Sequence, residues 1–434
     1  MTDSKTDSNL HTELDADGVL LARIDMPGRA MNVFSRDMMD SLEALVTRAG
    51  SDDRIRAVVL TSAKPAFLAG ADLAMIQMFT ERARTDSTAE LHQLFGHLGR
   101  LFRRLETNPK PFVAAINGLA LGGGLEVCLA CRERVVADDP AIQLGLPEVK
   151  LGLLPGAGGT QRLPRLIGTA KGLQMLLSGE PVTPTEALAL GLVDAMVPAD
   201  HLIETAKQRA LGISRAQAPW DAPGARFDSQ PYDFGNADAA RRAIVAAVGI
   251  SDYQWRYYPA YQAIVDCVIG GWSLPMTEAG EHEMRIFVEL MRDPVAGNMV
   301  RSLFLNRQRA AKQGLLGEQS PFAQGDDALL ARLRQAKAQA KAIDADEDTR
   351  LLLGAAAAFA CWQAGKAEPT DLADVAAVNA GLFPSYTGGP FSWLQQLGPA
   401  AVSARCANAD AALQAALAPL AQIGTLLGRN TAAA

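Results

Sequence analysis

The sequence has 434 residues, more than one hydrophobic core normally serves, which favours two or three domains. Hydrophobic residues make up 49% of the chain and charged residues 21%, a balance typical of a globular protein. The formal net charge is −7 and there is no run of lysine or arginine, so nucleic acid is excluded as an expected partner.

The first 200 residues alternate between strand and helix patterns. Short apolar or β-branched runs predict strands at residues 19–24, 56–61, 112–116 and 135–136. Helical spacing of apolar residues predicts helices at residues 32–49 and 90–106. This alternation indicates an α/β domain that runs to about residue 197.

The remaining residues have a helical pattern. Residues 211–236 are rich in proline, glycine and aspartate and read as a connector, whereas residues 237–313 have helical spacing. A break at residues 314–325 precedes an Ala/Lys/Arg-rich helix at 328–343 and an apolar helix at 349–364. We therefore expect a mostly α-helical C-terminal region.

Two features bear on location and redox state. Residues 1–12 are polar and lack an apolar signal segment, and the longest apolar run, near 351–361, is too short for a membrane span, so we expect a soluble, cytoplasmic protein. The five cysteines are scattered and predict no disulfide framework. Cys128 and Cys131 form a CxxC pair, but their apolar neighbours favour packing in a buried helix over zinc or redox chemistry.

Two glycine-containing segments follow predicted strands. Residues 67–72 (FLAGAD) form a small-residue turn in which backbone N–H groups can approach a ligand closely. Residues 117–126 (NGLALGGGLE) set three consecutive glycines before a helix, where N–H groups and the helix dipole favour negative charge. A simpler interpretation makes Glu126, just inside that helix, a charge complement worth only ~0.3–1 kcal/mol.

A third segment carries a second carboxylate. Glu148 lies among apolar residues in GLPE (145–148), ahead of GLLPGAGGTQR (152–162). Burial would raise the pKa of Glu148 and suit it to proton transfer, whereas a solvent-exposed loop carboxylate is the alternative. The run of residues 156–159 lacks both the GxGxxG order and a P-loop lysine, so we reject a nucleotide-binding loop.

In this order and spacing, the three segments resemble the crotonase, or enoyl-CoA hydratase/isomerase, superfamily over residues 13–200. The resemblance implies a fold of ββα turns wound into a superhelix, with CoA thioesters as ligands. It implies that the N–H groups of Ala71 and Gly123 form an oxyanion hole, which would stabilise the enolate formed when water adds to the 2,3-double bond. It also implies that Glu126 activates the water and Glu148 delivers a proton to C2, as a coupled pair.

Further roles follow from the same resemblance. The N–H of Gly156 is implied as an additional donor to the water, and Ala30 and Ala69 as parts of the CoA-binding site. Many single-domain hydratases have a lysine shortly after the position of Asp72, which this chain lacks, and this puts the contacts to the CoA phosphates in doubt. The presence of both glutamates favours an enoyl-CoA hydratase, a lyase. The alternatives are Δ3-Δ2 isomerisation, for which one carboxylate suffices, and another crotonase reaction.

Beyond residue 200 the chain resembles the α subunit of the multifunctional fatty-acid β-oxidation complex, with a helical linker at 201–315 and, at 325–434, the C-terminal part of a 3-hydroxyacyl-CoA dehydrogenase. The 42 residues from 306 to 347 contain no dinucleotide-binding motif, and such a domain needs well over ~100 residues. We therefore expect no NAD cofactor, no dehydrogenase activity and no metal. Expected partners are an acyl-CoA substrate and either a second copy or a thiolase or dehydrogenase subunit. A non-catalytic scaffold subunit is the remaining alternative.

Overall fold

The computed structural model describes residues 3–6, 9–214 and 217–426. The chain divides into two compact units, Met1–Arg292 and Asp293–Ala434. This division differs from the three predicted segments, because residues 201–292 pack with the N-terminal unit and residues 293–315 pack with the C-terminal helices.

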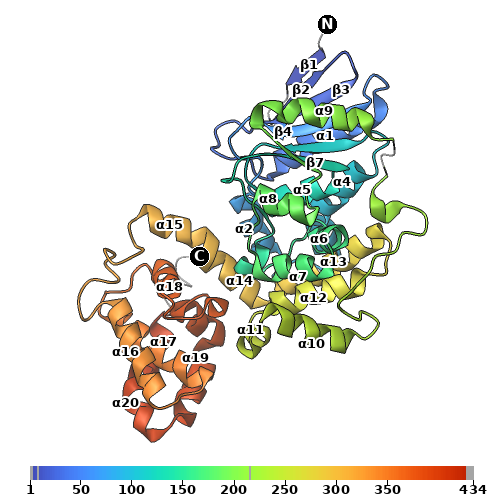
Figure 1. Ribbon diagram of the computed structural model, residues 1–434. Coiled ribbons are helices and arrows are strands. Elements are labelled where there is room, and N and C mark those ends of the chain that lie inside the picture. Colours follow the sequence, from blue (N-terminus) through green and yellow to red (C-terminus); the bar gives the residue numbers. More distant parts are fainter. Residues whose placement is uncertain (1–2, 7–8, 215–216, 427–434) are drawn as a thin grey trace. The chain divides into compact units, whose positions relative to one another are not determined.

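The first unit is built on a mainly parallel sheet (Figure 1). Its described strands follow the order β1-β2-β3-β4-β5-β7-β9, in which β1, β2 and β3 are antiparallel neighbours and the later neighbours are parallel. A second, short parallel pair joins β6 to β8. The strands are β1 (Asp3–Thr6), β2 (Leu10–Leu14), β3 (Val19–Ile24), β4 (Ala57–Ser62), β5 (Phe112–Ile116), β6 (Ala120–Leu121), β7 (Glu133–Ala137), β8 (Leu144–Gly145) and β9 (Ala195–Val197).

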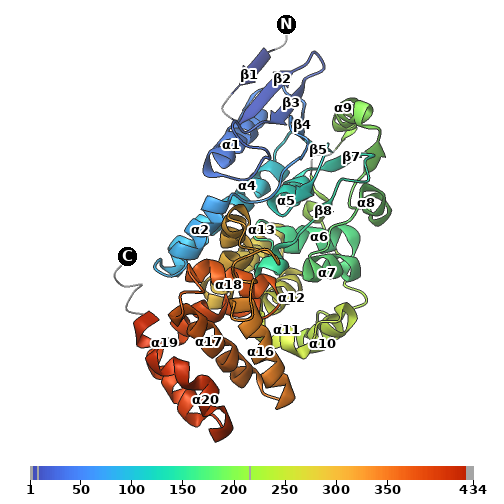
Figure 2. The same ribbon diagram turned by 90° about the vertical axis from the view of Figure 1, so that its left-hand side faces the viewer.

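The central parallel strands are covered on both faces. Every residue of β4 and β5 is buried, as expected for continuous apolar strands of a parallel sheet. Figure 2 shows α1 (Arg36–Ser51) and α9 (Leu202–Gly212) on opposite sides of the strands, and α9 packs on β4, β5 and β7. The predicted α/β fold class and the predicted strands are confirmed, the second with a shift of one residue.

Two helix predictions need correction. The helix predicted at residues 32–49 begins at Arg36, because the Ser35 side chain accepts a hydrogen bond from the Met38 N–H and caps the helix there. The helix predicted at 90–106 is two helices, α3 (Thr88–Phe95) and α4 (His97–Glu106), separated at Gly96. A Cβ at Gly96 would lie 2.7 Å from the carbonyl oxygen of His92, so the chain passes too closely there for another residue.

The remaining helices of the first unit lie around the sheet, and Figure 1 shows α10 and α11 below α6 and α7. The helix pair α12 and α13 packs against α6, and α13 also contacts α3. The remaining helices are α2 (Leu73–Arg82), α5 (Gly123–Ala130), α6 (Gly159–Ile167), α7 (Thr169–Ser178), α8 (Pro184–Leu190), α10 (Ala237–Val248), α11 (Asp252–Tyr257), α12 (Pro259–Gly271) and α13 (Met276–Arg292), with 3₁₀ turns η1 (Glu148–Leu151), η2 (Ala199–His201) and η3 (Pro219–Asp221).

The second unit is helical in the part that the structure describes, which confirms the predicted C-terminal region. Its core forms between α16, α17, α18 and α19 around Phe359, Phe391 and Leu372. None of the helices among the described residues has the length and apolar character needed to cross a bilayer. The elements are α14 (Pro294–Val300), a π-helical turn (Arg301–Leu305), α15 (Asn306–Lys312), α16 (Leu329–Ala342), α17 (Glu347–Gln363), α18 (Thr370–Asn379), η5 (Ser385–Thr387), α19 (Pro390–Asn408), η6 (Ala411–Leu413), α20 (Gln414–Leu417) and η7 (Ala418–Gln422).

Candidate active site

The glycine triplet positions Glu126 in the first turn of α5. Gly122 has φ +55° and ψ −130°, a backbone conformation that side-chain-bearing residues rarely adopt, and its N–H donates to the Gly145 carbonyl at 2.9 Å. A Cβ at Gly124 would lie 2.1 Å from the carbonyl oxygen of Leu68, so only glycine permits this approach. The triplet therefore lets α5 begin directly against the turn at residues 67–72.

Glu126 is a buried carboxylate held by two backbone amides. It is 3% exposed, and its Oε1 accepts hydrogen bonds from the N–H groups of Ala157 and Gly159, each at 2.8 Å. Burial raises the pKa of Glu126, while these two amides and the charge of Arg162 act in the opposite direction. The surroundings of Glu126 thus contain donors suited to its ionised form.

Glu148 lies beside Glu126 and has a different environment. It begins η1, shortly after β8, and the pairing of β8 with β6 brings it to the start of α5. Its Oε1 is 2.7 Å from where a Cβ on Gly122 would be. Its Oε2 is inaccessible to solvent and has no hydrogen-bond partner among the described residues, although the residue as a whole is only half-buried.

The electrostatics separate the two carboxyl groups. Burial raises the pKa of Glu148 well above its usual range, and the neighbouring charge of Glu126 raises it further. The structure therefore brings the predicted pair together. Amides donate to Glu126, whereas in the described part of the chain no group donates to the buried oxygen of Glu148. An ionised Glu126 beside a protonated Glu148 is the charge distribution that this geometry favours.

The two predicted oxyanion-hole amides lie on neighbouring segments. Leu121 donates its N–H to the Leu68 carbonyl at 3.1 Å, which aligns the turn at residues 67–72 with the glycine triplet. Within the part of the chain that the structure describes, neither the Ala71 N–H nor the Gly123 N–H donates a hydrogen bond to another residue. Because Gly123 is the first residue of α5, its N–H is one of the unpaired donors at the helix N-terminus.

The predicted CoA-binding residues lie on two segments that are joined by backbone hydrogen bonds. The Ala69 N–H donates to the Asn32 carbonyl at 2.9 Å, and Ala30, two residues earlier, is exposed. The sequence analysis missed Arg29, which forms a 2.5 Å ion pair with the nearly buried Asp72 and is half-exposed. A cation is thus present beside this turn even though the lysine found after it in many hydratases is missing.

The predicted water-positioning residue, Gly156, is next to the amides that hold Glu126. Its own N–H is not one of them, since Ala157 and Gly159 donate to Glu126. A Cβ at Gly156 would lie 3.4 Å from the ring of Phe287 on α13. The role of Gly156 stays a prediction.

A third buried carboxylate, Glu283 on α13, was not predicted. It is 1% exposed, and its Oε1 accepts a hydrogen bond from the Gly158 N–H at 2.7 Å. Burial, followed by the charge of Glu126, raises the pKa of Glu283 to about 8. The sequence contains one signal for it, because Glu283 is an acidic residue on the buried, otherwise apolar face of an amphipathic helix.

A buried ion pair fixes the other side of the same turn. Arg162 donates to both carboxylate oxygens of Glu106, at 2.8 and 3.1 Å, and to the Ala157 carbonyl at 2.9 Å. Arg103 and Trp220 add further donors to Glu106, at 2.6 and 3.0 Å. The turn between Pro155 and α6 is therefore tied to α4 as well as to α5.

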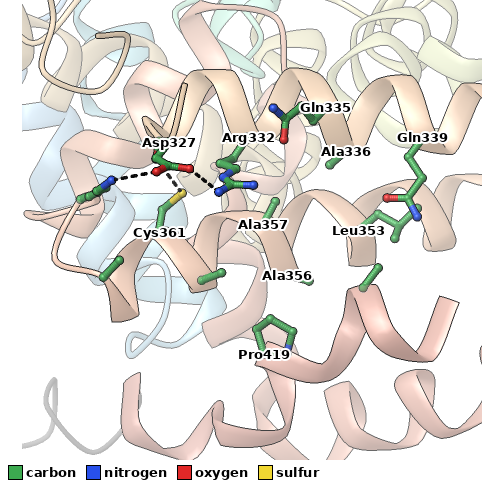
Figure 3. Close-up of a pocket in the computed structure, with 14 residues that line it drawn as sticks. Asp327, Arg332, Gln335, Ala336, Gln339, Leu353, Ala356, Ala357, Cys361 and Pro419 are labelled. Carbon is green, nitrogen blue, oxygen red and sulfur yellow. Dashed lines mark hydrogen bonds and ion pairs between the residues drawn. The ribbon is translucent and has the colours of Figure 1, made fainter. Parts of the chain in front are cut away.

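Two further features are the CxxC pair of the first unit and a cavity in the second unit. Cys128 and Cys131 are packed in and after the buried helix α5, as predicted, and burial raises the pKa of both thiols, that of Cys131 to about 12. The C-terminal unit has a cavity of about 410 Å³ between α16, α17 and η7. Several alanines line this cavity (Figure 3). Its two cations, Arg332 and Lys366, both pair with Asp327. The described residues that line the cavity include one carboxylate, Asp327, and therefore no carboxylate pair.

Sequence comparisons relate this chain to known proteins. Residues 16–219 match the family model "Enoyl-CoA hydratase/isomerase". The chain is 36% identical over 308 residues to the fatty acid oxidation complex subunit alpha of Shewanella halifaxensis, covering 70% of this chain and 42% of that protein. It is 37% identical over 301 residues to the corresponding subunit of Shewanella putrefaciens, and this match covers 68% of this chain and 41% of that protein. Among solved structures, an enoyl-CoA hydratase from Geobacillus kaustophilus is 25% identical, with a TM-score of 0.44 and coverage of 71% of this chain and 97% of that one.

Residues 16–219 therefore match the enoyl-CoA hydratase/isomerase, or crotonase, family. The chain's similarity to fatty acid oxidation α subunits extends beyond that segment and confirms the predicted resemblance. The chain spans about two-fifths of the length of these curated relatives.

Proposed function

We propose that this protein is an enoyl-CoA hydratase that adds water reversibly to a trans-2-enoyl-CoA and produces a 3-hydroxyacyl-CoA. The observation that supports it most is the unequal environment of the paired carboxyl groups. Two amides bind Glu126, whereas no described residue donates a hydrogen bond to the buried Oε2 of Glu148. Hydration needs one base and one acid at the same time, and this pair supplies both.

In the proposed mechanism, Glu126 removes a proton from water, and the resulting hydroxide bonds to C3 of the substrate. The electrons of the 2,3-double bond move toward the thioester oxygen and form an enolate, which then takes a proton at C2 from Glu148. Afterwards Glu126 holds the water's proton and Glu148 is ionised, so transfer of one proton from Glu126 to Glu148 restores the enzyme. The Gly156 N–H serves as an additional donor to the water.

The N–H groups of Ala71 and Gly123 stabilise the enolate oxygen in this proposal. This role is supported because neither N–H group donates a hydrogen bond to another described residue, and because Gly123 is the first residue of the buried helix α5. Fixed donors aimed at a developing oxyanion are each worth ~3–4 kcal/mol in acyl-transfer sites. Ala30 and Ala69, on the adjoining segments, contact the CoA portion of the substrate.

Hydration changes no net oxidation state, so the proposed reaction needs no nicotinamide cofactor, and we propose that the chain has no dehydrogenase activity. The family match and the relatives' involvement in fatty acid oxidation support a β-oxidation substrate. The expected partners, a second copy or a thiolase or dehydrogenase subunit, stay predictions.

The test replaces each glutamate by glutamine and measures turnover of crotonyl-CoA. Glu126→Gln and Glu148→Gln should each lower kcat by ~100-fold or more, because each removes a general acid or base. Glu204→Gln, an exposed glutamate on α9, is the matched control and should keep wild-type turnover. Near-normal activity of either site variant contradicts the assignment.

A trans-3-enoyl-CoA substrate separates the two family reactions. If the protein creates conjugated thioester absorbance from this substrate but does not remove it from crotonyl-CoA, the protein is an isomerase. If it acts on neither, the non-catalytic scaffold hypothesis replaces the hydratase.

A further inference from the structure

Four consecutive backbone amides at the start of α6 alternate between two carboxylates. The amides of residues 157 and 159 donate to Glu126, each at 2.8 Å. The amides of residues 158 and 160 donate to Glu283, at 2.7 and 3.2 Å. The same turn therefore holds Glu126 from one side and is itself held by Glu283 from the other.

Gly158, the second of these four residues, has an unusual backbone conformation. Its φ of +98° is left-handed, and a left-handed residue next to helical ones turns successive N–H groups toward anions. A Cβ at Gly158 would lie 1.9 Å from Nη1 of Arg162, so the position also lacks space for a side chain. The conformation of the turn then depends on what its amides bind, since glycine itself restricts the backbone little.

Glu283 comes from a helix outside the segment that matches the family model. It lies on the buried face of α13, next to Met284 and one turn from Phe287, whose ring packs against Gly156. A carboxyl group buried among such neighbours is costly unless hydrogen bonds compensate for the lost water. The bonds from the turn provide that compensation, so the carboxylate and the turn stabilise each other's position.

Thr160 reinforces the contact. Its hydroxyl is hydrogen-bonded to Oε2 of Glu283, and the amide nitrogen of the Gln161 side chain donates to that hydroxyl at 3.0 Å. The same Gln161 nitrogen donates to the Cys267 carbonyl of α12 at 2.8 Å. Helices α12 and α13 thus both bind the first turn of α6.

We infer that Glu283 is a positioning residue for the proposed reaction: by binding the amides of Gly158 and Thr160, it orients the amides that hold Glu126. This inference rests on the proposed function, because it takes Glu126 as the base. It assigns part of the active-site geometry to the helical segment at residues 276–292.

The charges around Glu283 give a readout that a purely structural role would not change. Glu126 and Glu148 face it from α5 and η1, Arg162 and Arg165 from α6, and the Cys267 thiol from α12. The pKa of Glu283 is raised to about 8 by burial and by Glu126. The pH profile of kcat should therefore contain an inflection near pH 8, where ionisation of Glu283 adds negative charge beside the pair.

The experiment compares Glu283→Gln with Glu289→Gln, an exposed glutamate of the same helix. In Glu283→Gln we expect hydrogen exchange in a peptide spanning residues 156–161 to accelerate about tenfold or more, and kcat to fall by about 10- to 100-fold, since displacement of catalytic groups by about 1 Å costs rates of this order. KM should change little, and the inflection near pH 8 should disappear. Glu289→Gln should match the wild type in all four measurements.

Thr160→Val is a second, milder variant for the case in which Glu283→Gln does not fold. It removes the hydroxyl bonded to Glu283 and keeps the shape of the side chain, whereas Thr160→Ser keeps the hydroxyl and should behave like the wild type. Unchanged exchange at residues 156–161 in Glu283→Gln or, failing its folding, in Thr160→Val would overturn the inference. A wild-type protein that hydrates no enoyl-CoA would refute the proposed function instead, and the exchange data would still decide whether Glu283 holds the turn.

Discussion

Gly122 allows a prediction that separates backbone strain from damage to the active site. The residue lies at φ +55° and ψ −130°, and a Cβ added to it would be 2.7 Å from Oε1 of Glu148. Gly168, between α6 and α7, also has a left-handed φ, +86°, but a Cβ added there would meet no atom within 4 Å. Gly122→Ala and Gly168→Ala therefore both introduce backbone strain, but only Gly122→Ala brings the new Cβ into close contact with Glu148.

The magnitudes follow from these geometries. A side-chain-bearing residue in such a conformation costs ~1–3 kcal/mol, so both variants should lose stability of this order. In Gly122→Ala, Glu148 must also move by about 0.7 Å, the difference between 2.7 Å and an ordinary contact of 3.4 Å. Because misplacement of a reacting group by about 1 Å can lower rates ~100-fold, we expect a fall in kcat of ~10- to 100-fold for Gly122→Ala only.

The assay combines denaturant unfolding with turnover of crotonyl-CoA for both variants and the wild type. Gly168→Ala should be destabilised but should keep kcat within about twofold of the wild type, because folded molecules retain the glutamate pair. If Gly122→Ala were destabilised as much as Gly168→Ala and yet turned over at the wild-type rate, Glu148 would not be the proton donor in the position described.

Two further predictions concern stability. Glu106→Gln should lower the free energy of unfolding by ~3–5 kcal/mol, because it leaves Arg162 charged, buried and without its carboxylate, and a loss of under about 1 kcal/mol in urea unfolding would contradict this. Asp374 is buried and caps α19 through the N–H groups of Phe391 and Ser392, and burial raises its pKa to about 7. Because the folded state binds this proton more tightly than the unfolded state, the free energy of unfolding of the C-terminal unit should decline by roughly 2–4 kcal/mol as pH rises from about 4 to 7. Asp374→Asn should abolish this pH dependence. A variant with the same pH profile as the wild type would refute the prediction.

The fold of the first unit was largely predictable because its strands are short apolar runs that only a buried parallel sheet explains. Residues 112–116, for example, were predicted as a strand and form β5 with every residue buried. Errors arose where a single local contact decides a boundary. The Ser35 cap sets the start of α1, and one turn residue, Gly96, separates α3 from α4 where a single helix was predicted.

The predicted proximity of Glu126 and Glu148 depended on a family resemblance, since 22 positions separate them and no periodicity links them. The pairing of β6 with β8 is the physical reason they meet. Glu283 was missed because its partner amides lie more than a hundred positions earlier in the chain. Hydrogen bonds between such distant segments arise only in the tertiary structure. The sequence signal for them is the presence of an acidic residue on the apolar face of α13.

The most direct test of the central claim follows the conjugated thioester absorbance when the protein meets crotonyl-CoA and then a decenoyl-CoA, with NAD added afterwards. The account predicts a rapid fall in absorbance with at least one substrate, a fall that slows ~100-fold or more in Glu148→Gln, and no formation of NADH. No fall with either substrate, or an undiminished fall in Glu148→Gln, would contradict the assignment of the glutamate pair to hydration, and formation of NADH would contradict the proposed absence of dehydrogenase activity.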